Sequence, residues 1–376
     1  MSYRYGASFV DPGLNTLVAP TSSYTYYLWA WGDNQIGTLG LGNITNYSSP
    51  KQVGSLTNWS AVNTGGYSQA DVKTDGTLWV CGNNAQGQLG LGNITPYSSP
   101  KQVGSLTNWK QVTNGGNQMI AIKTNGTLWA WGYNSDGRLG LGNTTYYSSP
   151  KQVGSLTNWS TFTCNNNATL AIKTDGTLWA WGAGVFGQLG LGNTTNYSSP
   201  KQVGSLTNWA TIVCNTATIA VKIDGTLWAW GQNNSGQLGF NNTTYYSSPK
   251  QIGALTNWSS ATVGGAYFMS SIKTNGTLWA WGYNSKGQLG LGNTTSYSSP
   301  RQIGSLTNWL SVSCGNQFCA SVKTDGTLWT WGQNDSGQLG LNVSTSTYYS
   351  SPKQVGTGTN WKQVSAFGSR VIGLAY

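Results

Sequence analysis

Residues 173–182 read Lys-Thr-Asp-Gly-Thr-Leu-Trp-Ala-Trp-Gly, and residues 187–192 continue with Gly-Gln-Leu-Gly-Leu-Gly. Related copies recur through the chain at steps of 49 to 51 residues. The seven copies of the Leu-Trp-x-Trp-Gly core begin at Leu28, Leu78, Leu128, Leu178, Leu227, Leu278 and Leu328, with Cys81 replacing the second Trp in one copy. The Trp of Thr-Asn-Trp keeps nearly the same step at Trp59, Trp109, Trp159, Trp209, Trp258, Trp309 and Trp361. A fixed period of this size indicates a solenoid, a propeller or an array.

Each copy has the local pattern of β-strands. Short runs of Trp, Tyr, Val, Ile and Thr are separated by Gly, Asn, Asp and Ser, which are turn residues. In one copy the predicted strands cover residues 59–63, 69–73, 77–82 and 98–103. Pro100 suits an edge strand because it has no N–H to donate to a ladder. Four antiparallel strands per repeat make a propeller blade, so we expect an all-β, seven-bladed β-propeller of four-stranded antiparallel blades.

The two ends of the chain each hold part of a repeat. The first Leu-Trp-Ala-Trp-Gly, at Leu28, has no Thr-Asn-Trp before it, and the last Thr-Asn-Trp, at Trp361, has no Leu-Trp-x-Trp-Gly after it. We therefore expect residues 361–375 to supply the two inner strands of a blade whose outer strands come from the N-terminal part. This pairing would close the ring of a propeller over residues 22–376, preceded by a non-repeat segment over residues 1–21.

The repeat also resembles that of a known family. Residues 325–341 read Asp-Gly-Thr-Leu-Trp-Thr-Trp-Gly-Gln-Asn-Asp-Ser-Gly-Gln-Leu-Gly-Leu, which is similar to the repeat of the regulator of chromosome condensation family. The resemblance covers roughly residues 28–376 and implies a seven-bladed propeller. For function it implies a nucleotide-exchange factor, a ubiquitin-ligase module or a protein inhibitor. The family's Gly-Gly-x-His step appears here as Gly65-Gly66-Tyr67-Ser68, and the chain has no His.

The formal net charge of +10 raises the possibility of an anionic partner. Thirteen of the nineteen Lys and Arg residues, however, occupy two repeated places. One set follows Ser-Pro (Lys51, Lys101, Lys151, Lys201, Lys250, Arg301, Lys353) and the other precedes the hairpin (Lys73, Lys123, Lys173, Lys222, Lys273, Lys323). These positions predict dispersed rings that serve solubility and edge protection. A nucleic-acid partner is therefore disfavoured.

Few side chains are suited to catalysis. Asp75, Asp175, Asp224 and Asp325 sit at hairpin tips where Asn125 and Asn275 occupy the same place, so a turn role is expected. The five Cys residues have no metal-ligand spacing, and we expect buried free thiols. We therefore expect no metal, no cofactor and no enzymatic activity. No apolar run approaches the length of a membrane span, and no signal peptide is readable at the N-terminus.

The copies differ from one another mainly in two connections per blade. In a four-stranded blade these two connections, first to second strand and third to fourth strand, emerge on the same face. Aromatic and amide residues vary there, and such residues give large contact area with adaptable hydrogen bonding. The candidate binding residues are Tyr67, Tyr133, Phe186, Tyr267, Phe268, Tyr283 and Phe318. The alternative is looser structural constraint on loops.

Two functions remain open from the sequence. The first is a non-catalytic recognition or structural module, a phage virion or surface component that binds a protein or a surface glycan through the variable loops. Residues 1–21 could then contact other subunits of an assembly. The alternative is an intracellular guanine-nucleotide exchange or chromatin-binding regulator, as the resemblance implies. That activity in the family uses an inserted hairpin and a basic N-terminal tail, whereas the first twenty residues here hold only Arg4.

Overall fold

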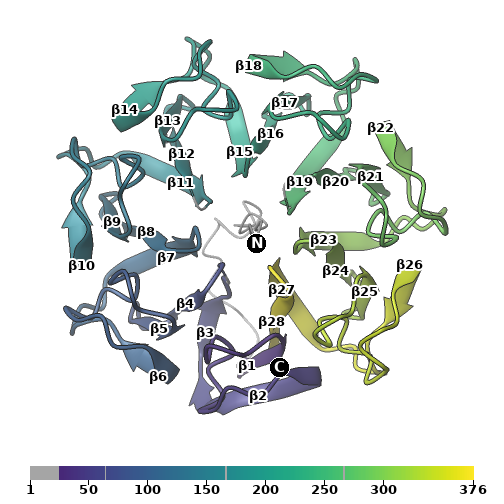
Figure 1. Ribbon diagram of the computed structural model, residues 1–376, viewed down its shortest axis with the longest axis horizontal. Helices are drawn as coiled ribbons and strands as arrows, with labels where there is room; N and C mark the ends of the chain where they lie inside the picture. Colours follow the sequence, from purple (N-terminus) through teal and green to yellow (C-terminus); the bar gives the residue numbers. More distant parts are fainter. Residues whose placement is uncertain (1–24, 64, 166, 266) are drawn as a thin grey trace.

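The computed structural model describes residues 25–63, 65–165, 167–265 and 267–376. These residues form seven four-stranded antiparallel sheets, arranged as blades around a central axis (Figure 1). The predicted all-β, seven-bladed propeller is therefore confirmed. The segment predicted to precede the propeller, residues 1–21, lies outside the described residues.

One blade illustrates the others. Its strands run outward from the axis in chain order, as β11 (Trp159–Cys164), β12 (Ala168–Lys173), β13 (Leu178–Gly182) and β14 (Tyr197–Gln202) (Figure 1). The outermost strand has Pro200 in its middle, at an edge where no inner ladder needs an N–H.

Five further blades repeat this order. Their strands are β3 (Trp59–Ala61), β4 (Ser68–Lys73), β5 (Leu78–Gly82) and β6 (Tyr97–Gln102); β7 (Trp109–Asn114), β8 (Gln118–Lys123), β9 (Leu128–Gly132) and β10 (Tyr147–Gln152); β15 (Trp209–Cys214), β16 (Ala217–Lys222), β17 (Leu227–Gly231) and β18 (Tyr246–Gln251); β19 (Trp258–Gly264), β20 (Phe268–Lys273), β21 (Leu278–Gly282) and β22 (Tyr297–Gln302); β23 (Trp309–Cys314), β24 (Phe318–Lys323), β25 (Leu328–Gly332) and β26 (Tyr349–Gln354).

The seventh blade joins the two ends of the chain, as predicted. It contains β27 (Trp361–Phe367) and β28 (Arg370–Ala375) from the C-terminus, followed outward by β1 (Tyr27–Gly32) and β2 (Tyr47–Thr57). Strands β1 and β28 pair without interruption from Tyr27 with Ala375 to Gly32 with Arg370. The ring is therefore closed by hydrogen bonds and packing between the N- and C-terminal segments.

The hydrophobic core lies in layers between neighbouring blades. Trp181 of β13 is fully buried among residues of the preceding blade, such as Ile122 and Leu128, and its Nε1 donates to the main-chain oxygen of Arg138 (3.0 Å). The Gly-x-Leu-Gly-Leu-Gly runs make this contact possible. Gly190 has a φ of +73°, and a Cβ there would lie 2.8 Å from Nε1 of Trp230 in the next blade. These runs are structural turns at which one blade meets the next.

Five of the six lysines that precede the hairpins are buried, contrary to the predicted solubility role, and Lys73 is half-buried. Lys173 is only 7% exposed, and its Nζ lies 3.8 Å from the ring centroid of Trp179 and 5.1 Å from that of Trp159. Burial lowers the pKa of this lysine. Lys123, Lys222, Lys273 and Lys323 have the same burial and the same two Trp neighbours in their blades. These cations therefore hold the inner and third strands together through cation–π contacts.

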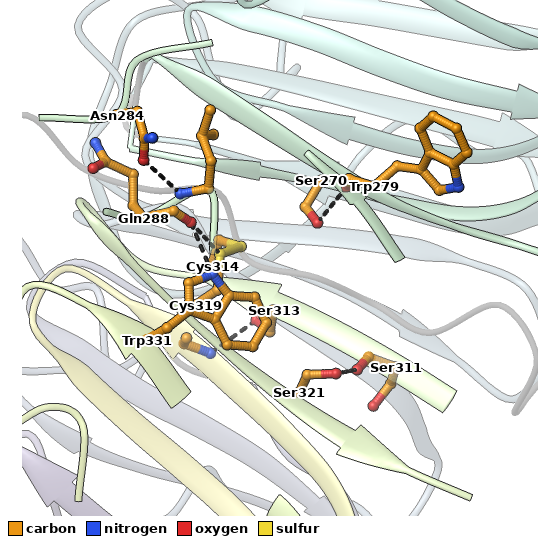
Figure 2. The surroundings of a disulfide bond; sticks show 12 residues. Ser270, Trp279, Asn284, Gln288, Ser311, Ser313, Cys314, Cys319, Ser321 and Trp331 are labelled. Carbon is orange, nitrogen blue, oxygen red and sulfur yellow. Dashed lines mark hydrogen bonds between the residues drawn. A yellow bond between two sulfur atoms is a disulfide. The ribbon is translucent and has the colours of Figure 1, made fainter. Parts of the chain in front are cut away.

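The cysteines also differ from the expectation of free thiols throughout. Cys314 and Cys319 form a disulfide between β23 and β24, with Cα atoms 4.1 Å apart. Figure 2 shows this disulfide beside the bond that Nε1 of Trp331 donates to the Gln288 oxygen (2.9 Å). Sequence spacing did not reveal the pair because the two residues face each other only once the hairpin has formed. Cys81, Cys164 and Cys214 are buried free thiols, as predicted.

Candidate functional site

The two faces of the disc are built from different segments. On one, which we call the uniform face, the hairpin between the second and third strands meets the link to the next blade: Trp209 N donates to the Gly176 oxygen (3.2 Å). On the other, the variable face, the first-to-second connection meets the third-to-fourth connection: Ala183 N donates to the Asn167 oxygen (2.8 Å). The predicted division of the connections between two faces is therefore present in the structure.

The variable face carries one pair of adjacent residues in every blade. In each pair, the first residue of the third-to-fourth connection donates its N–H to the carbonyl of the last residue before the second strand, over 2.8 to 3.0 Å. The seven pairs are Asp33 with Ser369, Asn83 with Tyr67, Tyr133 with Asn117, Ala183 with Asn167, Gln232 with Thr216, Tyr283 with Tyr267, and Gln333 with Gln317. A constant backbone bond thus holds side chains that differ from blade to blade.

Four of the seven predicted binding residues belong to these pairs. Tyr67, Tyr133, Tyr267 and Tyr283 are half-buried, so each has a fixed position and an accessible edge. Tyr267 and Tyr283 lie in one blade, with ring centroids 6.1 Å apart in an edge-to-face arrangement. The structure therefore brings these two together and places Tyr67 and Tyr133 in the two adjacent blades that begin at β3 and β7.

Tyr133 is the centre of a larger cluster. Its ring lies 4.6 Å from the ring of Tyr146 and 4.6 Å from the guanidinium carbon of Arg138, which is also paired with Asp136. Hydrogen bonds from Ser135 and Tyr146 lower the pKa of the Tyr133 hydroxyl. Sequence reasoning missed Tyr146, which is 44% exposed, because it lies thirteen residues further along the same connection.

Phe186 lies on the variable face in the blade that follows the Tyr133 blade. It is half-buried and its main-chain N–H donates to Oε1 of Gln188 (2.9 Å), while the preceding Val185 is 55% exposed. This connection has Gly184 where the other blades have an Asn. In those blades the Asn side chain bonds across the loop, as where Oδ1 of Asn134 accepts from the main-chain N of Leu139 (2.9 Å). Val185 and Phe186 thus add an apolar patch to the face.

Phe268 and Phe318 are a correction to the predicted binding set. Both are the first residue of a second strand, β20 and β24, and both have no exposed surface. Each ring fills the space beside a glycine: a Cβ on Gly264 would lie 2.0 Å from the Phe268 ring, and one on Gly315 would lie 2.1 Å from the Phe318 ring. They are core residues at blade junctions. Each Phe directly follows a residue of the variable face, Tyr267 or Gln317. Successive residues of a strand point to opposite sides, so each Phe points into the core.

The variable face is close to electrically neutral. Its connections contain Asp33, Asp136 and Asp335 together with Arg138 and Lys286, and Arg370 begins β28 beside them. Arg370 is buried, with Nη2 3.6 Å from Asp33, so one cation and one anion offset each other. The excess positive charge of the chain therefore lies elsewhere, chiefly in the two rings of lysines.

The family model of the RCC1-like domain matches residues 28–372. The chain belongs to the RCC1-like domain family. No curated protein sequence matches it.

Three solved structures of this propeller type are similar over 93% or more of the chain. Human WBSCR16 has 21% identity and a TM-score of 0.83, covering 93% of this chain and 98% of its own. Prp20p from Saccharomyces cerevisiae, described with its binding to Gsp1p and histones, has 18% identity and a TM-score of 0.84, covering 100% and 96%. The yeast RCC1 (Prp20) bound to Kap60 has 19% identity and a TM-score of 0.84, covering 94% and 89%. At these identities the likeness shows a shared fold.

On the uniform face of this RCC1-like propeller the Asp residues at the hairpin tips serve the turns. Oδ1 of Asp175 accepts from the main-chain N of Thr177 (2.9 Å) and from its hydroxyl (2.6 Å), and Nε1 of Trp179 donates to the same hydroxyl (3.0 Å). Asn125 makes the corresponding bonds to Thr127. This confirms the predicted turn role of the Asp and Asn residues at the hairpin tips.

One buried carboxyl was not singled out from the sequence. Asp71 of β4 is 3% exposed, and burial raises its pKa to about 7. Nε2 of Gln69 (2.5 Å) and the main-chain N of Asn63 (3.1 Å) donate to it. Five other blades have Ala or Ser at this strand position, such as Ala121 and Ser271, and the closing blade has Gly373. The distinguishing signal was an acidic residue at a strand position where the other copies have small uncharged residues.

The described residues hold neither a metal-binding cluster nor a membrane-spanning helix. No three ligand side chains of His, Cys, Asp or Glu gather there into a group that could hold a metal ion. Within the same residues, no helix is long and apolar enough to cross a membrane.

Proposed function

We propose that this propeller is a non-catalytic module that binds a protein partner through its variable face. The observation that carries the proposal is the set of seven residue pairs, which share one backbone hydrogen bond and differ in side chain from blade to blade. A rigid frame with variable side chains is the usual construction of a binding surface, because the scaffold positions loops that can diversify without loss of the fold.

The chemistry of the face favours a protein. Tyr67, Tyr133, Tyr267 and Tyr283 are half-buried, so little side-chain freedom is lost when a partner covers them. Asn, Gln and Thr in the other pairs offer adaptable hydrogen bonds. The balanced charge of the face provides no row of cations for phosphates, which a nucleic-acid partner would require.

A second candidate is the intracellular exchange or chromatin-binding regulator. It is supported by membership of the RCC1-like family and by the likeness to Prp20p, which binds Gsp1p and histones. Neither the family nor these structures supports a virion or surface role, or a glycan on the variable face. We therefore favour an intracellular protein partner over a virion component.

Photo-crosslinking tests the proposed face. The photoreactive residue p-benzoylphenylalanine at position 67 or 283 should capture the partner from a lysate of the source. The same residue at position 206, on the uniform face, should not. Each of the changes Tyr133→Ala, Tyr267→Ala and Tyr283→Ala should then weaken binding of the identified partner by about 2 kcal/mol, which is about 30-fold in Kd. Equal capture at position 206 would place the interface elsewhere.

The second candidate has a separate measurement. Release of labelled GDP from Gsp1 should be accelerated by catalytic amounts of this protein if it is an exchange factor, and Tyr267→Ala should reduce that rate. An unchanged release rate would remove the exchange function but leave protein binding through the variable face intact.

A further inference from the structure

A pair of indole rings repeats at the uniform-face end of the blades. In five blades a lysine at the end of the second strand places its ammonium group between these rings, which come from the first and third strands. For Lys173, Nζ lies 3.8 Å from the ring centroid of Trp179 and 5.1 Å from that of Trp159. Across the five blades the nearer ring centroid is 3.7 to 3.9 Å from Nζ. The blade therefore holds an ammonium group by cation–π contacts on two sides.

The closing blade keeps the two rings but has no lysine at this place. Trp29 and Trp361 have ring centroids 6.3 Å apart, and the same pairs in the five lysine-containing blades are 5.9 to 6.3 Å apart. In the ladder, Ala375 is the residue opposite Trp361, whereas Lys173 is the residue opposite Trp159. The strand position that supplies the ammonium group elsewhere therefore supplies only a methyl group here.

Both rings of the closing blade are accessible. Trp29 and Trp361 are half-buried, whereas the residues equivalent to Trp361 in the five lysine-containing blades are only 2 to 3% exposed. Two replacements uncover Trp361. Ala375 is short, and Gly358 stands where every other link between blades has a leucine, such as Leu306. A Cβ on Gly358 would lie 3.8 Å from Nε1 of Trp361, so a larger side chain there would cover that edge of the ring.

A positive charge beside the pair does not exclude a cation. Lys362 directly follows Trp361 and is exposed. Lys110 has the same place in another blade and is also exposed. In that blade Nζ of Lys123 nevertheless lies 3.8 Å from the ring centroid of Trp129. The pair in the closing blade can therefore accept an ammonium group with an exposed lysine beside it, because solvent screens the repulsion between them.

We propose that Trp29 and Trp361 bind a lysine side chain of a partner protein. The chain itself identifies the ligand, because the corresponding position is Lys in all six other blades and five of these lysines lie between the same two rings. The ring faces attract the ammonium group, and the methylene chain of lysine packs on the indoles. This site lies on the uniform face and does not depend on the proposal for the variable face.

The surface around the pair favours a polypeptide over a free amine. Leu310 lies on β23, the inner strand that packs beside β27, and is 52% exposed. Leu306, in the link before β23, is 47% exposed. A polypeptide can cover these leucines while its lysine enters between the rings, and burial of their apolar surface would add to the cation–π contacts. A free amine would bind through the rings alone.

Model compounds test the chemistry of the ligand. Nα-acetyl-lysine amide and the uncharged Nα-acetyl-norleucine amide are added separately to the intact ¹⁵N-labelled protein, and the indole N–H resonances are followed after assignment by single Trp→Phe variants. We expect the lysine compound to shift the resonances of Trp29 and Trp361 with a Kd on the order of 10 mM, because a single cation–π site binds weakly. The norleucine compound should leave them in place.

Peptides test the source of the lysine. An array of peptides with one central lysine is probed with the protein, beside an identical array in which that lysine is acetylated. We expect some peptides to bind about tenfold more tightly than the lysine compound, and to lose that binding on acetylation, which removes the charge. Binding of the lysine compound without any tighter peptide would overturn a protein partner. Peptide binding that survives acetylation would overturn recognition of the ammonium group.

Variants supply or remove the parts of the site. Ala375→Lys provides the lysine from within the chain, so it should raise the melting temperature and weaken binding of the lysine compound by about tenfold. Trp29→Leu removes one ring and should also weaken binding, without adding a charge. Lys173→Ala frees the matching pair in another blade and should add shifts at Trp159 and Trp179. Equal shifts from the norleucine compound, unchanged binding in Ala375→Lys and Trp29→Leu, or no added shifts in Lys173→Ala would each overturn the proposal.

Discussion

Nε1 of Trp31 donates a hydrogen bond of 3.0 Å to the main-chain oxygen of Gln338, which lies 307 residues further along the chain. The same bond joins each pair of blades that carries the second Trp, for example Trp131 to Gln88 and Trp281 to Gln237. In the copy with Cys81, the thiol lies 3.8 Å from the corresponding oxygen of Thr38. Ring closure therefore uses the same contact as every internal blade junction.

Removal of residues 361–376 should abolish the stable fold. Without β27 and β28, strand β1 loses its hydrogen-bonded partner β28. The neighbouring blade then exposes Phe318 and the other apolar residues that pack against Val364 in the intact protein. We expect insoluble protein or a large drop in melting temperature. The milder Trp31→Phe change should cost about 1 kcal/mol through loss of one hydrogen bond. A truncated protein that melts within a few degrees of the full chain would contradict closure through the C-terminus.

Charge reversal at Lys173 should destabilise the protein. Lys173→Glu places a carboxylate between the faces of Trp159 and Trp179 and should cost about 2 to 3 kcal/mol in the free energy of unfolding. Lys173→Met keeps the apolar stem and should cost about 1 kcal/mol. Urea unfolding provides the measurement.

The matched control for Lys173 is Lys151, which is exposed and lies 5.4 Å from the Tyr147 ring. Lys151→Glu should change stability by less than about 0.5 kcal/mol. Equal effects at the two positions would show that burial between the indoles is not the cause.

Stability should fall as the pH rises from 4 to 8, because of Asp71. The folded pKa of about 7 lies above the ordinary value of 3.8, so between these values the folded state holds a proton that the unfolded state has released. The full effect is at most about 4 kcal/mol, taking 1.4 kcal/mol per pH unit. Asp71→Asn, measured by urea unfolding across this range, should flatten the profile.

Asp75 gives the opposite sign and serves as the control. Hydrogen bonds from Thr77 lower its pKa, so its contribution is present above pH 4 and is lost as the pH falls further. Asp75→Asn should therefore leave the decline between pH 4 and 8 unchanged. If Asp71→Asn also left it unchanged, another group would be responsible.

Reduction of the Cys314–Cys319 disulfide should lower the free energy of unfolding by about 2 kcal/mol, the loop-entropy value for so short a loop. Alkylation of the denatured, unreduced protein should label Cys81, Cys164 and Cys214, and all five cysteines should react after reduction. Cys314→Ser with Cys319→Ser should melt at the temperature of the reduced protein and show no further response to reductant. Labelling of five cysteines without reduction would contradict the disulfide.

The sequence alone was enough to predict the propeller, the four strands of each blade and the closure between Leu28 and Trp361. Each of these depends on local signals: the period of the repeat, alternation within short strands, and turn residues such as Thr74-Asp75-Gly76. The division into a uniform and a variable face followed from strand order, because successive antiparallel connections alternate between the two ends of a sheet.

Contacts between side chains of different strands and of neighbouring blades were decided only by the tertiary structure. The sequence predicts a surface position for Lys173, whereas folding places it between Trp159 and Trp179. Phe268 is buried and Tyr267 is accessible because the two side chains point to opposite sides of the strand. The Cys314–Cys319 pair, the raised pKa of Asp71 and the accessible ring of Trp361 also depend on neighbours brought together by folding. A repeat determines its own strands through short-range preferences, whereas burial and hydrogen-bond partners depend on side chains that folding brings together from other strands and from the neighbouring blade, and these side chains vary from blade to blade.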